Sequence, residues 1–247
     1  MGDGTRHIMK DFWDAKAREN AMYYISSYRA YDAQDPDEFW KWGAILAGQL
    51  LDESGIPFAG DETMLEIGCG IGRMTATFAG RFAQVHGIDV SGEMIRQAAS
   101  NLEGFSNVAL QVGNGSDLSC YADGSFDFVF SYITFQHIPD ANVTLAYIRE
   151  AGRVLKAGGH FYFQVNNMGS TPRGRLNLGA RIRSLLARRP KNAAAGSGPR
   201  DLDHPAWQGS RVTWEQIGRA CDAGALDILS DRGRGTQYLW VKAVKRL

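Results

Sequence analysis

The sequence predicts an α/β fold with a doubly wound, mostly parallel sheet and helices on both of its faces. Beyond residue 60, short apolar runs alternate with amphipathic stretches, as in parallel strands joined by crossover helices. A glycine-rich turn follows the first of these runs directly. An aromatic N-terminal segment and a late basic insertion lie outside this alternation. We therefore expect seven strands, an N-terminal helical extension over residues 1–60 and a main domain over residues 61–247.

The N-terminal segment predicts two helices that are joined near residue 35. Aromatic residues recur between Ile8 and Glu53 at broadly helical spacing, and Asp35-Pro36 interrupts them. Proline suits the first turn of a helix, where its missing N–H is not needed, so Pro36 is expected to start the second helix.

The main domain is expected to alternate strands with helices along its length. Strands are expected at 64–67, 85–89, 108–112, 126–132 and 160–165, with helices at 72–82, 91–102 and 141–155. Thr213 is expected to cap a further helix that runs to about Cys221. Two last strands are expected near 226–229 and 238–244.

A basic insertion is expected after the fifth strand, at about residues 168–210. Its centre, residues 173–200, holds eight Lys and Arg residues and no acidic residue. Apolar residues between 178 and 186 recur at helical spacing, which predicts a short amphipathic helix, and the run 192–199 is typical of a loop. The insertion is either a solvated helix with a loop or a cover over a substrate site, whose arginines recognise a carboxylate or phosphate.

Composition narrows the classes of function. The formal net charge is zero, which disfavours nucleic acid or an anionic membrane as a partner held by overall charge. The three cysteines form no CxxC pair, and no cluster of His, Cys and carboxylate residues has metal-ligand spacing. No stretch approaches the roughly 20 apolar residues of a membrane helix, and the N-terminus lacks a signal-peptide core. We expect a cytoplasmic protein without a metal.

The glycine-rich turn Glu66-Ile67-Gly68-Cys69-Gly70-Ile71-Gly72 predicts a ligand site. Glycine has no side chain to hold a ligand away from the backbone and adopts positive φ without strain. The third glycine comes one residue earlier than in the G-x-G-x-x-G turn of dinucleotide sites. The Glu66 carboxylate would repel a pyrophosphate and favours a cationic ligand, such as a sulfonium with an ammonium. A nicotinamide-dependent oxidoreductase is therefore an alternative and not the leading interpretation.

Glu66-x-Gly68-x-Gly70-x-Gly72 resembles the first motif of class I S-adenosylmethionine-dependent methyltransferases, which have a Rossmann-like fold. Asp89, at the end of the second expected strand, matches the family's acid that accepts hydrogen bonds from both ribose hydroxyls. Val90 and Met94 match residues that line the adenine.

Later segments continue the resemblance in the family's order, so that it covers residues 63–165. Residues 113–118 are similar to a Gly-Asp-Ala segment whose polar side chain meets the adenine amino group. Asn114 stands where aspartate is usual, and Asp117 is a rival in the same loop. The resemblance implies bound S-adenosylmethionine, released as S-adenosylhomocysteine, with these cofactor residues: Glu66, Gly68, Cys69, Gly70, Gly72, Asp89, Val90, Met94, Asn114, Gly115, Ser116 and Ser131.

The resemblance implies methyl transfer by in-line displacement to an oxygen or nitrogen of a small-molecule acceptor. Because the insertion is basic, this acceptor is expected to carry an anionic group. His137 follows the fourth strand and is a general base, a cofactor or substrate contact, or a structural histidine. Gln136 lies beside it as a candidate substrate residue. In the family, N-terminal helices often close over the cofactor, which nominates Tyr23 and Tyr24 as substrate residues of a lid; packing against the sheet is the alternative role of these aromatics.

Two alternatives from other classes stay open at this point. The basic insertion suggests an RNA methyltransferase, but base-amine methyltransferases usually carry an Asp/Asn-Pro-Pro-aromatic segment where Ser131-Tyr132-Ile133-Thr134 stands here. A non-catalytic binding protein is the other. The motifs identify a methyl donor and leave the acceptor and the oligomeric state open.

Overall fold

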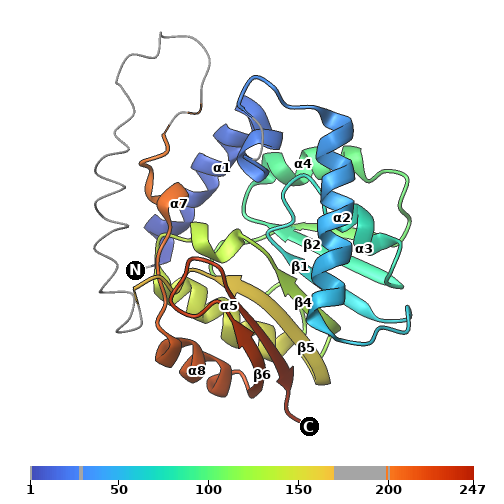
Figure 1. Ribbon diagram of the computed structural model, residues 1–247, viewed down its shortest axis with the longest axis vertical. Helices are drawn as coiled ribbons and strands as arrows, with labels where there is room; N and C mark the ends of the chain where they lie inside the picture. The colour runs from blue at the N-terminus through green and yellow to red at the C-terminus, as the bar shows by residue number, and fades with distance from the viewer. Residues whose placement is uncertain (1, 28–29, 170–198, 200) are drawn as a thin grey trace.

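A seven-stranded sheet runs through the middle of the computed structural model, which describes residues 2–27, 30–169, 199 and 201–247 (Figure 1). The strand order is β3-β2-β1-β4-β5-β7-β6. Strand β7 is antiparallel to both of its neighbours, and the other pairs are parallel. The predicted doubly wound, mostly parallel sheet is confirmed. Its strands are β1 (Thr63–Ile67), β2 (Gln84–Asp89), β3 (Val108–Val112), β4 (Phe126–Ser131), β5 (Leu155–Val165), β6 (Leu226–Arg232) and β7 (Leu239–Lys245).

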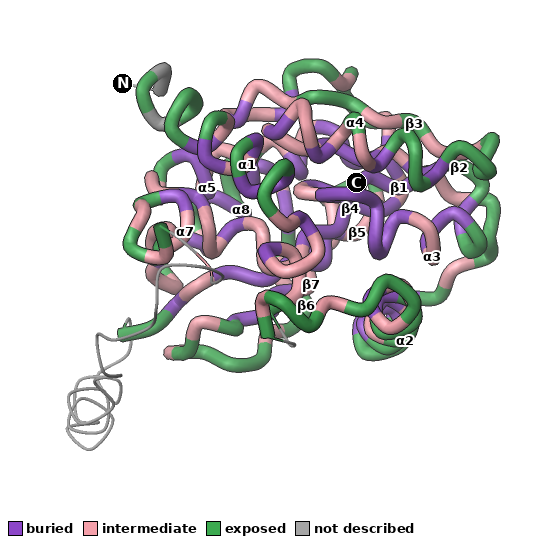
Figure 2. Tube along the Cα trace, turned by 90° about the horizontal axis from the view of Figure 1, so that it is seen from above, coloured by how far each residue is buried: buried purple, intermediate pink, exposed green. Residues whose placement is uncertain are grey.

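Helices cover both faces of this sheet, and the side chains that they bury alternate along the strands. On one face, α5 and α8 enclose a core that includes Leu65 and Val129; on the other face, α2 and α3 enclose Met64 and Phe128. Figure 2 shows that buried residues are concentrated on the strands and on the helix sides that face them. The helices are α1 (Gly2–Ile25), α2 (Pro36–Ser54), α3 (Thr75–Ala79), α4 (Gly92–Asn101), α5 (Ala141–Val154), α7 (Pro205–Gln208) and α8 (Trp214–Ala223), with a 3-10 turn η1 (Thr134–His137).

Capping residues fix where several helices start. Asp35 caps α2 by accepting a hydrogen bond from the backbone N–H of Glu38 at 3.1 Å, and Pro36 is the first helical residue, as predicted. Thr213 and Gln216 form a reciprocal capping box at the start of α8. Helix α1 is kinked at Asn20, whose side-chain oxygen accepts the N–H of Tyr23 and so caps the last helical turn.

Helix α1 lies beside α4, near the carboxyl ends of β1 and β2 (Figure 1). One side chain makes the main polar link between the two helices. The Asp14 carboxylate accepts a hydrogen bond of 2.6 Å from the Ser91 hydroxyl and one of 3.0 Å from the N–H of Glu93, in the first turn of α4. A carboxylate at a helix N-terminus is favoured by the helix dipole. Asp14 therefore holds α1 next to Asp89, the end of β2.

Several element boundaries differ from those expected. Helix α3 covers 75–79 instead of 72–82, because the backbone of Gly72 has a positive φ of 86° and the chain is still turning there. Strand β5 begins at 155, directly after α5, and not at 160. The helix expected between 178 and 186 lies outside the described residues, as does all of the loop expected at 192–199 except Pro199. Among the described residues, no helix is both long and apolar enough for a membrane span.

Gly152→Ala is expected to destabilise the fold. A Cβ on Gly152 would lie 2.1 Å from the carbonyl oxygen of Gly224, where α5 meets the end of α8. Relief requires one backbone to move away from the other, at a cost on the order of 1–3 kcal/mol of unfolding free energy. Gly218→Ala is the matched control, because a Cβ there has no atom within 4 Å and alanine favours a helix by roughly 0.5–1 kcal/mol. Urea unfolding that gives both variants the same midpoint would contradict this packing.

Candidate functional site

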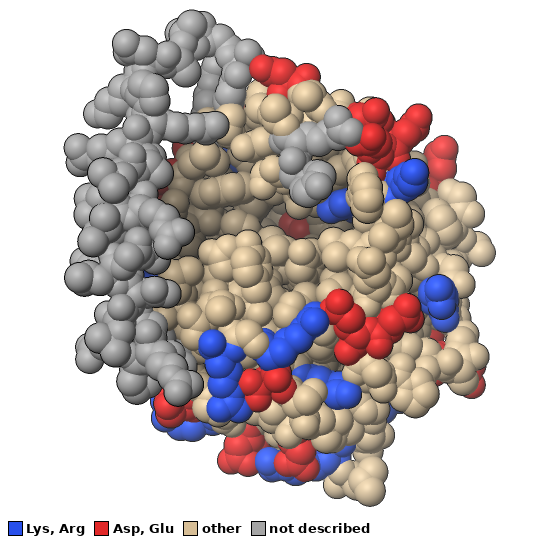
Figure 3. Space-filling view, viewed as in Figure 1, with Lys and Arg blue, Asp and Glu red and all other residues tan. Residues whose placement is uncertain are grey.

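A cavity opens at the carboxyl ends of β1 and β4, the two neighbouring strands in the middle of the sheet. The chain leaves β1 toward β2 and leaves β4 toward β5, on opposite sides, so that the two connections diverge there. In open α/β sheets, ligands bind at such a divergence. Figure 3 shows the hollowed face of the molecule, where mainly uncharged atoms surround the hollow. We call this cavity the first cavity; the glycine turn, the end of β2, α1 and the β4–η1 turn line it.

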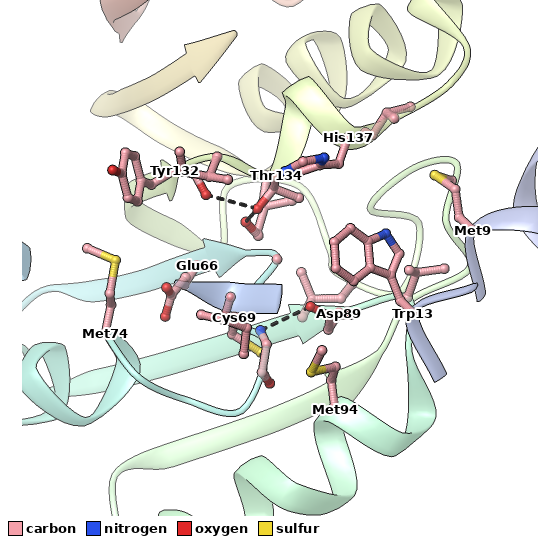
Figure 4. A pocket seen from close by; sticks show the side chains of 18 of the residues that line it. Met9, Trp13, Glu66, Cys69, Met74, Asp89, Met94, Tyr132, Thr134 and His137 are labelled. Carbon is pink, nitrogen blue, oxygen red and sulfur yellow. Dashed lines mark hydrogen bonds between the residues drawn. The ribbon is translucent and has the colours of Figure 1, made fainter. Parts of the chain in front are cut away.

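The glycine turn approaches the segment after β4 very closely. Gly68 has a φ of 80°, and a Cβ on it would lie 2.0 Å from the Thr134 hydroxyl oxygen. That hydroxyl is within hydrogen-bond distance of two carbonyl oxygens, at 3.1 Å from that of Ile67 and 3.2 Å from that of Tyr132, and its proton is shared between them (Figure 4). A side chain at position 68 would force the two segments apart. The first glycine of the motif is therefore required by packing as well as by its φ.

Asp89 joins the end of β2 to the glycine turn. One of its carboxylate oxygens accepts the N–H of Gly70 at 3.0 Å and the other accepts the N–H of Ser91 at 2.9 Å. Burial raises the pKa of Asp89 to about 6, and these backbone donors oppose the rise. Since each carboxylate oxygen has a further lone pair, Asp89 has acceptor capacity left for two hydroxyl groups of a ligand.

Glu66 is a second carboxyl group in the first cavity and is buried, whereas Asp89 is half-buried. The Thr75 hydroxyl, in the first turn of α3, donates a hydrogen bond of 2.6 Å to it. Burial raises the pKa of Glu66 to about 8, and the nearby charge of Asp89 adds to the rise. In Figure 4, Glu66 and Asp89 lie on either side of Cys69. A buried and a half-buried carboxyl group, without a cation paired to either of them in the described part of the chain, fit a positively charged ligand.

The turn between β4 and η1 is strained. Ile133 has a φ of 64°, in the left-handed region, which costs a β-branched residue roughly 1–3 kcal/mol. Its N–H donates to the side-chain oxygen of Gln164 at 3.0 Å, and the Gln164 amide in turn donates to the carbonyl of Gln237. The buried Gln164 side chain thereby holds the turn in place. Tyr132, Thr134 and the residues of η1 are positioned by this turn.

His137 has a fixed tautomer. Its Nδ1 lies 2.7 Å from the carbonyl oxygen of Trp207, and because a carbonyl oxygen only accepts, Nδ1 carries the proton. Nε2 of the neutral ring then holds the free lone pair. The ring also packs edge to face against Trp13 of α1 (Figure 4). Burial lowers the pKa of His137 below its ordinary value, against a smaller opposite effect of the Trp207 hydrogen bond.

A second cavity of about 970 Å³ adjoins the first. It lies between α2, the β4–η1 turn and the chain around α7. Part of its mouth is apolar: the Trp42 and Tyr238 side chains that line it are 49% and 50% exposed. Six residues line both cavities and mark the passage between them: Tyr24, Ile25, Arg73, Tyr132, Ile133 and His137.

The structure brings most of the predicted cofactor residues together. Eight of them line the first cavity: Glu66, Gly68, Cys69, Gly70, Asp89, Val90, Met94 and Gly115. Of the predicted substrate residues, Tyr24 lines both cavities and Gln136 lines the second, whereas Tyr23 packs against other tyrosines and lines neither.

Four predicted cofactor residues lie outside the cavity lining, and local bonding explains two of them. The Asn114 side-chain oxygen accepts the N–H groups of Ser116 and Asp117, and its amide donates to the Asp117 carboxylate, so both of its ends close its own loop. The Ser131 hydroxyl donates to the carbonyl of Ile67 between the strands. The four residues are Gly72, Asn114, Ser116 and Ser131.

Several residues of the site were not expected from the sequence. Trp13 and Met9 come from α1, and Arg73 and Met74 follow the glycine turn directly. The one sequence feature that could have identified Arg73 as a site residue is its position, as a lone basic residue directly after the glycine turn. No group of three or more His, Cys, Asp and Glu side chains able to hold a metal occurs in the described ranges.

One family and two relatives each match less than half of the chain. Residues 65–163 match the family described as "Methyltransferase domain". The ubiquinone biosynthesis O-methyltransferase of Xanthomonas oryzae pv. oryzae (strain PXO99A) is 34% identical over 105 residues, which cover 42% of this chain and 43% of that protein. The arsenite methyltransferase of Aquipseudomonas alcaligenes is 36% identical over 111 residues, which cover 40% of this chain and 31% of that protein. The chain thus matches less than half the length of these relatives.

A solved structure resembles the whole chain in its fold. It is phosphoethanolamine N-methyltransferase 1 of Haemonchus contortus in complex with phosphoethanolamine and S-adenosylhomocysteine. The TM-score is 0.67 at 18% sequence identity, and the match covers 100% of this chain and 50% of that one. This likeness extends the agreement in fold beyond residues 65–163 to the N-terminal helices and the last strands.

Proposed function

We propose, from the match of residues 65–163 to the family described as "Methyltransferase domain", that the chain is a class I S-adenosylmethionine-dependent methyltransferase that methylates an oxygen or nitrogen atom of a small-molecule acceptor. The observation that carries the proposal is the pair of carboxyl groups at the glycine turn, the buried Glu66 and the half-buried Asp89, beside a second cavity. A cationic methyl donor fits the first cavity, and an acceptor fits the second cavity.

S-adenosylmethionine supplies, when bound, a methyl group on a positively charged sulfur. Asp89 would accept hydrogen bonds from the ribose hydroxyls, and Val90 and Met94 would line the adenine. The glycine turn would contact the rest of the donor through its backbone. The task of these residues is to hold the donor so that its methyl group faces the passage into the second cavity, because in-line displacement depends on alignment.

The second cavity is the proposed acceptor site. Its exposed apolar mouth, formed by Trp42, Ile45, Met168 and Tyr238, favours an acceptor with an apolar body. The arginine-rich residues that suggested an RNA acceptor lie outside the described residues. The apolar mouth of the second cavity supports a small molecule as the acceptor.

His137 is the proposed general base. It lines both cavities, and the Trp207 carbonyl leaves its Nε2 as the proton acceptor. The neutral form predominates near pH 7, because burial lowers the pKa of the ring. An acceptor hydroxyl or ammonium would lose its proton to Nε2 as the methyl group is transferred.

Helix α1 is the proposed lid of the first cavity. Met9, Trp13 and Tyr24 line the cavity from α1, and Lys16 pairs with Glu19 in α1 and with Asp201 near α7. This arrangement closes the site on the side of α1 and keeps water away from the reacting atoms. The proposal assigns residues 1–60 to the cap and residues 61–247 to the catalytic domain.

Ligand-induced thermal shifts test the donor assignment. S-adenosylmethionine and S-adenosylhomocysteine are expected to raise the unfolding temperature, because both bind the folded state only, whereas NAD is not. Release of S-adenosylhomocysteine is then measured with a panel of phenols, primary amines and arsenite. Stabilisation by NAD, or binding without release from any acceptor, would contradict the proposed enzyme and support the oxidoreductase or the non-catalytic alternative.

Donor affinity is expected to rise with pH. In the ligand-free protein the pKa values of Asp89 and Glu66 are raised to about 6 and about 8, so a bound cation must displace protons from them. The affinity for S-adenosylmethionine should therefore increase between about pH 5.5 and 7.5, by at most roughly 10-fold per pH unit for each proton released. S-adenosylhomocysteine lacks the sulfonium charge and should show a weaker dependence.

The Glu66→Gln variant provides the control for this pH dependence. The pKa of Glu66 is about 8 in the ligand-free folded protein and near 4.5 in the unfolded chain. Between these two pH values the folded protein holds a proton that the unfolded chain has lost. The free energy of unfolding therefore falls as the pH rises toward 8. The variant should lack this loss and the upper part of the affinity rise. An identical pH dependence of calorimetric donor binding in wild type and variant would rule out Glu66 as the group responsible.

A further inference from the structure

Arg73 is a buried cation that forms no ion pair with a carboxylate in the part of the chain that the structure describes. Its side chain is 9% exposed, and its Nε donates a hydrogen bond of 3.0 Å to the carbonyl oxygen of Phe39 in α2. The guanidinium carbon lies 4.8 Å from the centre of the Phe39 ring. None of the ion pairs between described residues includes Arg73. A guanidinium has five N–H donors, and the Phe39 carbonyl uses one of them.

Neighbouring residues hold Arg73 in this position. A Cβ on Gly43 of α2 would lie 2.5 Å from the Arg73 side chain, so α2 packs closely against the arginine and leaves no room for a larger residue at position 43. Burial lowers the pKa of Arg73 from its ordinary value, and the hydroxyl of Tyr132 opposes this effect only in part. Burying a charge without a partner is costly. The cost is offset when an anion binds.

The position of Arg73 indicates which anion would reach it. Arg73 lines both cavities, between the glycine turn and α2. Among the described residues that line the first cavity, Arg73 is the one Arg or Lys, and the Glu66 and Asp89 carboxyl groups line the same cavity. S-adenosylmethionine carries the complementary set of charges: a sulfonium, an ammonium and one carboxylate. The Asp35 and Glu38 carboxylates line the second cavity, and neither is joined to Arg73 by an ion pair between described residues.

We propose that Arg73 is the oxyanion-binding residue of the site, and that it binds a carboxylate of the methyl donor or a carboxylate or phosphate of the acceptor through its planar guanidinium. The proposal rests on the proposed function, because it assumes that the donor and the acceptor occupy the two cavities. It assigns to Arg73 a binding role at the passage between them. A pairing of this kind is charge-assisted and has two parallel hydrogen bonds when the geometry is bidentate.

The first experiment compares two donors by calorimetry. S-adenosylmethionine and decarboxylated S-adenosylmethionine differ in the carboxylate alone. If Arg73 binds that carboxylate, the wild-type protein should bind S-adenosylmethionine about 10- to 100-fold more tightly than the decarboxylated compound. Arg73→Met should bind both with equal affinity, and Arg73→Lys, which keeps the charge without the planar fork, should give an intermediate ratio.

The second experiment tests the acceptor as the source of the oxyanion. Benzoate and inorganic phosphate are titrated into the complex with S-adenosylhomocysteine, whose own carboxylate is already in place. If the acceptor supplies the oxyanion, at least one of these probes should bind, and Arg73→Met should weaken it about 10-fold or more while leaving the ratio of the two donors unchanged. Arg81→Met is the matched control, since it removes an exposed arginine outside both cavities.

The outcomes separate this proposal from the proposed function. An Arg73→Met protein that binds S-adenosylhomocysteine, but shows wild-type donor discrimination and wild-type affinity for both anions, would overturn the role of Arg73 and leave the methyltransferase intact. A wild-type protein that binds neither donor would overturn the proposed function itself. If Arg73→Met does not fold, Arg73→Lys is used instead. The proposal is contradicted if this variant has the wild-type ratio of affinities for S-adenosylmethionine and its decarboxylated form, and if the protein binds neither benzoate nor phosphate.

Discussion

Asp89→Ala is expected to lower the affinity for S-adenosylmethionine and S-adenosylhomocysteine by about 100-fold or more. Two hydrogen bonds from ribose hydroxyls to a charged acceptor contribute roughly 1.5–3 kcal/mol each. The substitution also frees the N–H groups of Gly70 and Ser91, so that the glycine turn loses one of its hydrogen bonds to the end of β2. Isothermal titration calorimetry measures the change for both ligands.

Asp127→Ala is the matched control for this prediction. Its carboxylate also accepts a backbone N–H, that of Thr63, and pairs with Lys156, yet it lies outside both cavities. The control variant should be less stable than wild type and should bind both ligands normally. Equal ligand affinities of Asp89→Ala and Asp127→Ala would show that the ligand does not contact Asp89.

His137→Gln is expected to lower kcat by about 10²- to 10⁴-fold, the range that general-base catalysis contributes, with an acceptor from the panel that supports turnover. Donor binding should change by less than about threefold, because the proposed contact is with the acceptor proton. In the wild type, the rate should fall as the pH drops through the His137 pKa, which lies below the ordinary value of 6.5. Steady-state rates between about pH 5 and 9 measure both effects.

His160→Gln controls for the loss of a half-buried histidine. His160 is in β5, has a pKa also lowered by burial, and lines neither cavity. The His160→Gln variant should have the same dependence of rate on pH as the wild type. A His137→Gln variant that keeps the wild-type kcat, or that loses donor binding and catalysis in the same proportion, would assign His137 to the structure of the site and not to proton transfer.

Local sequence signals were sufficient for most of the fold. Strand positions follow from apolar runs, and a helix start follows from a cap and a proline that act within one turn, as at Asp35-Pro36 and Thr213. The same holds for the base of the site, because Glu66, the three glycines and Asp89 lie at the ends of adjacent parallel strands, where the topology alone brings them together.

Contacts between distant segments were not predictable in this way. The Trp207 carbonyl that orients His137 comes from a segment 70 residues further along the chain, and the position of Trp13 depends on how Asp14 ties α1 to α4. Asn114 was expected at the adenine because of its place in the segment 113–118 that resembles the family, and in the structure its side chain closes its own loop. The proposed role of Arg73 depends on its having no ion-pair partner among the residues that the structure describes, which no sequence pattern records.

A crystal structure with S-adenosylhomocysteine tests the central claim most directly. The ligand is expected in the first cavity, with its ribose hydroxyls on Asp89, its adenine near Val90 and Met94, and its sulfur facing the passage between Tyr132 and His137. A ligand bound elsewhere, or one in the first cavity with its ribose away from Asp89, would contradict the assignment of this cavity to the methyl donor.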